Sequence, residues 1–204
     1  MSGDGPVMVD SGGANISSLR FALGRLGCSA PLSADPARIR AASHVFLPGV
    51  GAADSAMTRL EQGGLADVLR SLRQPVLGIC LGMQLLFEHS DEDGGRACLG
   101  VVPGRVRRIA AGPDRPVPHM GWNLTSLAPG CPLFTGLPAA AHFYYVHSYA
   151  ASPGPHTVAV ADYGGEFTAM VSHGNFHGAQ FHPERSGPAG ARVLANFLAL
   201  QAAA

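Results

Sequence analysis

Residues 75–88, PVLGICLGMQLLFE, contain a short apolar run that is followed at once by a helical pattern. Cys80 stands at the junction, inside the pentapeptide Gly78-Ile79-Cys80-Leu81-Gly82. A strand, a sharp turn and a helix lift a nucleophile above the carboxyl edge of a sheet, and small residues relieve the crowding in the turn. The following helix directs its positive N-terminus at the sulfur, which favours thiolate. The pattern predicts a nucleophilic cysteine, and the alternative is a buried structural thiol.

On both sides of this stretch, short apolar runs alternate with helical patterns. Strands are expected at 6–10, 44–51 and 75–80, and helices at 14–27, 33–42, 52–64, 65–73 and 81–90. From about residue 97, short segments rich in β-formers follow, and a helix over 190–202 ends the chain. The alternation predicts an α/β fold. It is expected to be a three-layer, open, mostly parallel sheet with helices on both faces and added antiparallel strands in the C-terminal half. We expect residues 1–204 to form a single domain.

Composition narrows the classes of function. The 204 residues carry a formal net charge of zero, which gives no electrostatic reason to expect nucleic acid or an anionic membrane as partner. All 14 basic residues are arginines, so Schiff-base and phosphate-loop lysines are excluded. The four cysteines show no zinc or disulfide spacing, and no segment resembles a signal peptide or a membrane span. We expect a cytoplasmic protein with no cofactor and no metal.

Two further motifs supply partners for a thiol. In AQFHPE, residues 179–184, His182 and Glu184 lie two positions apart, so an extended chain points both to the same side. Glu184 is then able to orient one imidazole nitrogen while the other faces Cys80. PGVG, residues 48–51, ends another strand at the same sheet edge, where glycines allow a backbone N–H to approach a ligand. Plain turns are the alternative for both motifs. His173 and His177 flank a predicted hairpin turn and are expected at the surface.

PGVG, GICLGMQLL and FHPE together resemble the class I, triad-type glutamine amidotransferases. VDSGGANISSL, PHMGWN, FYYVHSY and FHPERSG narrow the resemblance to the glutaminase subunits of imidazole glycerol phosphate synthases, over nearly the whole chain. Three positions depart from the usual pattern: Ser11 replaces tyrosine, Ala14 replaces glycine and Arg185 replaces lysine. Arg185 keeps the charge at an expected partner contact, although arginine and lysine are not equivalent.

The resemblance implies glutamine hydrolysis through a cysteinyl thioester, for histidine biosynthesis. It assigns the catalytic triad to Cys80, His182 and Glu184, and the oxyanion hole to the backbone of Val50, Gly51 and Leu81. The residues implied to bind substrate L-glutamine are Gly49, Gly51, Gln84, His147, Ser148 and Tyr149. Gln84 lies one helical turn after Cys80, and its contact is expected to be the α-amino group or the carboxylate. A half-buried strand is the alternative for residues 147–149.

The same resemblance implies a heterodimeric partner, a (β/α)₈-barrel synthase subunit that receives the ammonia. The residues implied to face it are Met120, Trp122, Asn123, Tyr145 and Arg185. Three alternatives remain: a glutaminase subunit of another synthase, a stand-alone γ-glutamyl hydrolase, and a catalytically silent subunit that only binds a barrel. PHMGWN and VHSY argue against the first, and the intact triad argues against the last.

Overall fold

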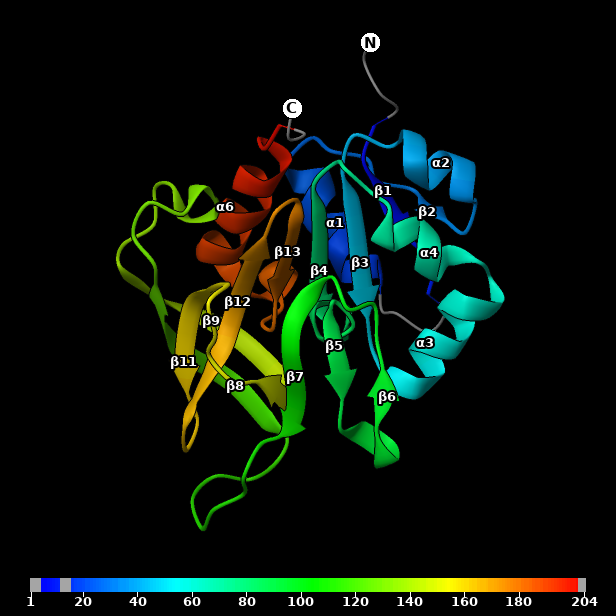
Figure 1. Ribbon diagram of the computed structural model, residues 1–204. Helices are drawn as coiled ribbons and strands as arrows, with labels where there is room; N and C mark the ends of the chain where they lie inside the picture. The colour runs from blue at the N-terminus through cyan, green and yellow to red at the C-terminus, as the bar shows by residue number, and fades with distance from the viewer. Residues whose placement is uncertain (1–4, 12–15, 202–204) are drawn as a thin grey trace.

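The structure, a computed structural model, describes residues 5–11 and 16–201, and its larger sheet has nine strands (Figure 1). In spatial order these are β2 (Leu32–Ser33), β1 (Val7–Val9), β3 (Val45–Gly49), β4 (Val76–Cys80), β13 (Phe176–Ala179), β12 (Glu166–His173), β11 (Thr157–Asp162), β8 (His119–Leu127) and β9 (Ala140–His147). The pairings from β2 to β13 are parallel, and those from β13 to β9 are antiparallel. The predicted parallel sheet with added antiparallel strands is confirmed.

Helices cover both faces of the parallel strands, as the sequence predicted. They are α1 (Ile16–Arg25), α2 (Pro36–Ala41), α3 (Ala53–Gln62), α4 (Leu65–Arg70), α5 (Leu81–Gln84) and α6 (Gly187–Leu198). Adjacent residues of β3 point into different cores. Phe46 packs with Phe197 of α6 in one core, whereas Leu47 lies with Met57 of α3 in the other. The alternation of a strand thus produces the three layers.

A second, four-stranded sheet was not expected from the sequence. It consists of β10 (Tyr149–Ala151), β7 (Val102–Arg108), β5 (Phe87–Ser90) and β6 (Arg96–Ala97). It forms because the helix predicted over 81–90 ends at Gln84, and the chain then turns into β5. Leu85, Leu86 and Phe87 are all buried, so this stretch has no polar face, and Phe87 pairs with Val102 of β7.

The hairpin between β12 and β13 is confirmed at Gly174, which has a φ of +59°. His177, however, is buried rather than exposed, because it lies on β13 between two strands and bonds Ser172 Oγ over 2.9 Å. In the described ranges no set of three or more His, Cys, Asp and Glu side chains has the arrangement of a metal site. Within those ranges, no helix has the length and apolar character needed to cross a bilayer.

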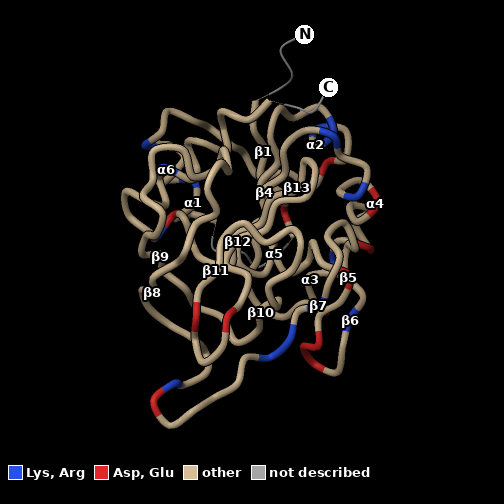
Figure 2. The backbone as a smooth tube through the Cα atoms, turned by 60° about the vertical axis from the view of Figure 1, so that its left-hand side comes forward, with Lys and Arg blue, Asp and Glu red and all other residues tan. Residues whose placement is uncertain are grey.

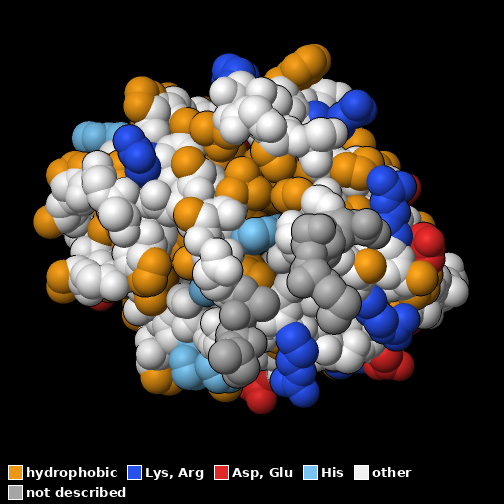
Figure 3. All heavy atoms as spheres, turned by 90° about the horizontal axis from the view of Figure 1, so that it is seen from above, with side chains coloured by type: hydrophobic (Ala, Val, Ile, Leu, Met, Phe, Trp, Pro, Cys, Tyr) orange, Lys and Arg blue, Asp and Glu red, His pale blue; other side chains and the backbone are white. Residues whose placement is uncertain are grey.

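The carboxyl ends of the central strands β3 and β4 lie at one end of the molecule. The arrow of β3 points toward the bottom of the view (Figure 1), and β4 runs parallel to β3. Seen from above, the end at which β3 begins shows apolar side chains near its centre and arginines around the rim (Figure 3). Basic and acidic segments are interspersed along the backbone (Figure 2). Because β3 and β4 run away from this end, their carboxyl ends lie at the opposite end of the molecule.

Candidate active site

Cys80 occupies a strained turn between β4 and α5. Its φ is +55° and its ψ −112°, a backbone conformation that a residue with a side chain rarely adopts. The flanking glycines allow the turn to pack. A Cβ on Gly82 would lie 1.7 Å from the Leu47 carbonyl oxygen, and one on Gly78 would lie 2.5 Å from the Gly82 oxygen. The sharp turn predicted around the cysteine is thus present, and each glycine is required by backbone contact.

Gly49 ends β3 directly beside Cys80 in the parallel ladder. A Cβ there would lie 2.7 Å from the Gly82 nitrogen, so Gly49 keeps α5 close to β3. Gly49 is absent from the residues that line the cavity beside Cys80, although it was predicted to contact substrate. In the structure Gly49 instead packs directly against the first residues of α5.

His182 follows β13 and faces Glu184, which lies on the short 3₁₀ turn Pro183–Arg185. The expectation of an extended segment is corrected here, because the proline starts a turn. The turn still brings Glu184 Oε1 to 2.8 Å from His182 Nδ1, which donates to it. Nε2 of His182 is buried and has no hydrogen-bond partner. Burial acts to lower the pKa of His182, but the neighbouring Cys80 and Glu184 side chains raise it to about 10.

A cavity of about 270 Å³ opens beside the cysteine. The residues that line it are Val50, Gly51, Cys80, Leu81, Gln84, Glu92, Pro118, Val146, His147, Ser148, Tyr149 and His182. The structure therefore brings together most of the residues that the sequence placed at the site. Glu92, Pro118 and Val146 were missed, because they come from a 3₁₀ turn, a loop and a strand that carry no local signal of chemistry.

PGVG supplies two of the residues that line the cavity, Val50 and Gly51. Gly51 has a φ of +90°, which glycine tolerates and other residues rarely adopt, and Val50 is 37% exposed. Both line the cavity together with Leu81, the first residue of α5. Backbone amides at the start of a helix and in a glycine turn are the donors from which oxyanion holes are built.

Two buried glutamines connect the cysteine to the floor of the cavity. The Gln84 amide nitrogen donates to the Tyr149 carbonyl over 2.8 Å and to Gln180 Oε1 over 3.0 Å. Gln180 is fully buried, and its amide nitrogen lies 3.8 Å from Cys80 Sγ, to which it donates. The thiol itself donates to the Val146 carbonyl over 3.7 Å. Gln180 was not predicted, because its partners lie about a hundred residues away in the chain.

The outer face of β8 exposes a row of apolar side chains. Met120, Trp122 and Leu124 alternate along the strand and are 62%, 57% and 51% exposed. Trp122 contacts the ring of Tyr144 edge-on, and the Arg185 guanidinium lies 4.4 Å from the centroid of the same ring. We refer to Met120, Trp122, Leu124, Tyr144 and Arg185 as the β8 face. Leu124 and Tyr144 were not predicted to belong to it.

Two residues predicted to face the partner lie elsewhere. Tyr145 is fully buried, and its hydroxyl is 2.7 Å from Thr125 Oγ1. It points inward because alternate residues of β9 face opposite sides, so Tyr144 takes the outer position. Asn123 is half-buried and donates to the Asp162 carbonyl over 2.8 Å.

The departures from the family pattern have different settings. The Ser11 hydroxyl donates to the Pro48 carbonyl over 3.2 Å, so this buried side chain is hydrogen-bonded to the first residue of PGVG, near the end of β3. The Arg185 guanidinium stacks on the Tyr144 ring. Ala14 lies outside the described residues.

Comparison with known proteins gives the same family throughout. The family model "Glutamine amidotransferase class-I" matches residues 7–200. The chain is 49% identical over 199 residues to the imidazole glycerol phosphate synthase subunit HisH of Vibrio cholerae, covering 95% of this chain and 98% of that protein. It is 53% identical over 191 residues to the HisH of Xanthomonas axonopodis pv. citri, covering 94% and 95%.

Solved structures of lower sequence identity have the same fold. PurLQS from Thermotoga maritima matches with a TM-score of 0.70 at 19% identity, covering 97% of this chain and 98% of that one. A glutamine amidotransferase from the same organism matches with a TM-score of 0.63 at 17% identity, covering 98% and 82%.

Proposed function

The chain belongs to the class I glutamine amidotransferase family, and from this premise we propose that it is the glutaminase subunit of an imidazole glycerol phosphate synthase. Relatives about half identical to it over nearly their whole length carry that synthase's name. One observation carries the proposal of activity. The unpartnered Nε2 of His182 lies buried beside a strained cysteine, and its other ring nitrogen is held by Glu184.

In the proposed first step, Cys80 Sγ attacks the side-chain carboxamide carbon of glutamine. The thiol proton of Cys80 passes to Nε2 of His182, whose raised pKa favours accepting it, as the sulfur attacks. Backbone amides of Val50, Gly51 and Leu81 stabilise the negative oxygen of the tetrahedral intermediate, each donor contributing about 3 kcal/mol. The C–N bond then breaks, His182 protonates the leaving nitrogen, and ammonia departs from a thioester. Water attacks the thioester carbon as His182 accepts its proton, and the C–S bond then breaks, which releases glutamate and returns the sulfur and His182 to the start of the cycle.

The α-ammonium group of glutamine needs acceptors, and two lining residues supply them. Glu92 carries a carboxylate among the residues that line the cavity, and its Oε2 accepts from the Ala53 amide over 2.7 Å. Both amide hydrogens of Gln84 are already donated within the protein, so its remaining capacity is the acceptor Oε1. We therefore assign Gln84 and Glu92 to the α-ammonium rather than to the carboxylate, with residues 147–149 lining the rest of the substrate.

Ammonia released in this cavity has to reach a second active site before water protonates it. We propose that the heterodimeric partner is a (β/α)₈-barrel synthase subunit, docked on the β8 face. An exposed apolar row beside an arginine stacked on tyrosine has the composition of an interface core. A cytoplasmic location and one domain over residues 1–204 belong to the same proposal.

The test is glutaminase turnover of the chain alone, with the barrel subunit, and with the barrel subunit plus its nucleotide ligand. Strong stimulation in the last mixture is the expected result, because the resemblance makes activity depend on the complex. Full activity of the chain alone would instead indicate a stand-alone hydrolase. Absence of turnover in all three mixtures would indicate a silent binding subunit.

A further inference from the structure

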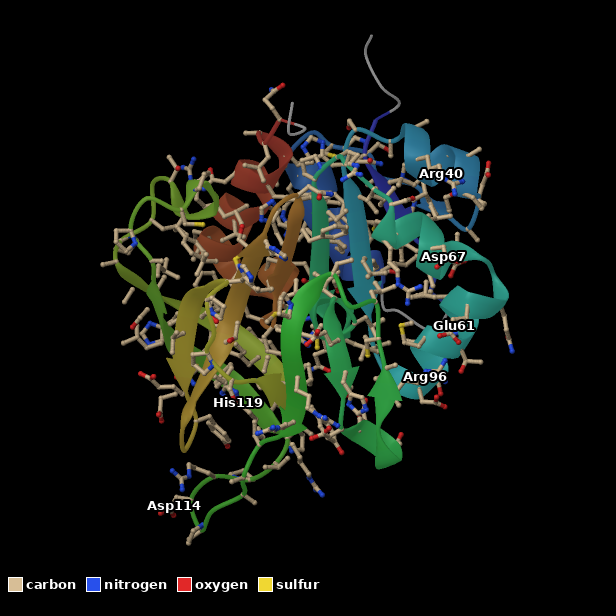
Figure 4. All side chains as sticks on the ribbon, viewed as in Figure 1. Arg40, Glu61, Asp67, Arg96, Asp114 and His119 are labelled. Carbon is tan, nitrogen blue, oxygen red and sulfur yellow. The ribbon has the colours of Figure 1, made fainter. Side chains whose placement is uncertain are left out.

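We propose that His119 is a positioning residue for glutamine binding, which acts through His147 on the cavity wall formed by residues 147–149. The proposal rests on the function proposed above and deepens it. His119 is the first residue of β8 (Figure 4) and lies directly opposite His147 of β9 in the antiparallel ladder. His147 lines the cavity, whereas His119 does not. His119 is therefore one layer removed from the substrate.

The hydrogen bonds between these rings run in one direction. His147 Nδ1 lies 2.9 Å from the Tyr149 carbonyl, which can only accept, so Nδ1 carries the proton. His147 Nε2 is then the acceptor for His119 Nδ1, 3.0 Å away. His119 Nε2 is left as an acceptor, and the Asn123 amide nitrogen lies 3.4 Å from it. One tautomer of each ring, with the proton on Nδ1, satisfies all three hydrogen bonds. In this arrangement His119 is the donor to His147.

Packing holds the His119 ring in the plane that this bond requires. The ring stacks on Tyr163 with centroids 4.0 Å apart and on Tyr145 with centroids 5.0 Å apart. Both histidines are buried. Burial lowers the pKa of each to about 4, so both rings are neutral at neutral pH and the assigned tautomers apply.

Residues 147–149 form the crossing from the larger sheet to the smaller one. His147 ends β9 in the larger sheet, Tyr149 starts β10 in the smaller sheet, and Ser148 lies between them on the cavity wall. The Tyr149 carbonyl accepts from His147 Nδ1 and also from Gln84. Since Gln84 continues through Gln180 to the thiol, the crossing is fixed relative to the nucleophile. Without the donor on His119, the His147 ring loses its fixed orientation. The Tyr149 carbonyl then loses its hydrogen bond from His147 Nδ1 and keeps only the one from Gln84.

The test compares variants of His119 in the complex with the ligand-bound barrel subunit. His119→Phe keeps a ring between the two tyrosines but removes the donor. His119→Asn places an amide donor close to the position of Nδ1 but removes the stack. His119→Gln, one methylene longer, places its amide near Nε2 instead and serves as a second variant without the donor. His177→Phe is the matched control, because it removes another buried histidine that does not line the cavity.

Two readouts separate positioning from general damage: KM against kcat for glutamine, and calorimetric glutamine binding in a Cys80→Ala background. His119→Phe and His119→Gln are expected to raise KM and the dissociation constant about tenfold while kcat changes less than threefold. His119→Asn is expected to stay within about twofold despite a lower unfolding temperature, and His177→Phe to leave KM unchanged. The proposal is overturned if His119→Phe binds glutamine as the parent does, or if His119→Asn is as impaired as His119→Gln. A parent complex that neither binds nor hydrolyses glutamine would instead overturn the proposed function.

Discussion

The neighbours of His182 reverse the effect of its burial. An imidazole in an apolar setting normally loses its proton more easily, yet Cys80 and Glu184 bring the pKa of His182 to about 10. Glu184 contributes both a charge that raises this pKa and a hydrogen bond to Nδ1 that leaves Nε2 free for the thiol. The His-Pro-Glu sequence was sufficient to predict this pair, because the two residues are nearly adjacent.

Replacing Glu184 by Gln keeps an acceptor for Nδ1 and removes the charge. We expect kcat/KM for glutamine to fall by about 10²–10⁴, because the imidazolium is no longer stabilised. The pKa of His182, followed by NMR of the ring nitrogens, is expected to move down toward its ordinary value. An unchanged kcat/KM would show that Glu184 has no part in the reaction.

Three buried neutral histidines make stability depend on pH. Burial lowers the pKa values of His119, His147 and His177 to about 4, so between pH 4 and 6.5 the unfolded chain binds more protons than the folded one. The free energy of unfolding is therefore expected to fall as pH decreases from 6.5 to 4, by about 3 kcal/mol for each histidine. Urea titrations across this range measure it, and His177→Phe should flatten the slope. A flat profile for the parent protein would contradict the account.

At the scale of elements, the turn after β4 is held by close backbone contacts with β3. The strand, glycine turn and helix start were predictable, because their signals are local in the sequence. The end of α5 at Gln84 was not, because it depends on β5 pairing with β7 further along the chain. The same holds for β9, where sequence alone does not decide whether Tyr144 or Tyr145 faces outward, since register is set by the neighbouring strands.

A matched pair of glycine substitutions tests the packing of the turn. In Gly82→Ala the added methyl group overlaps the Leu47 carbonyl oxygen. The free energy of unfolding is expected to fall by about 3 kcal/mol or more, with loss of glutaminase activity. Gly24→Ala lies inside α1, where no heavy atom is near the added methyl group. This variant is expected to raise the free energy of unfolding by about 0.5–1 kcal/mol. Chemical denaturation of both variants measures the difference. Equal stabilities would show that the turn is not sterically locked.

At the scale of the whole molecule, the catalytic cavity and the β8 face share strand β9. β9 ends at His147 on the cavity wall, and its Tyr144 lies under Arg185 on the outer face. The peptide N–H of His182 also donates to the Tyr144 carbonyl over 2.9 Å. A partner bound to this face therefore contacts the strand that carries part of the catalytic site. The sequence predicted a partner only through resemblance, because an exposed apolar row has no distinct local pattern.

Substitution of the β8 face tests where the partner docks. Trp122→Ala is expected to raise the dissociation constant of the complex with the barrel at least tenfold, since interface tryptophans contribute more than about 1.4 kcal/mol when buried. Leu32→Ala is the control, because this partly exposed leucine lies on the opposite edge of the sheet. Titration calorimetry measures both affinities. Equal affinities would place the docking surface elsewhere.

The central claim is that Cys80 is the nucleophile of a glutaminase that feeds ammonia to a partner. The most direct measurement is product formation by the complete complex carrying Cys80→Ala, with either glutamine or ammonia as nitrogen source. We predict that glutamine-dependent synthesis and glutamate release are lost, while complex formation and ammonia-dependent synthesis stay at the parent level. Glutamate release at the parent rate from the Cys80→Ala complex would contradict the account.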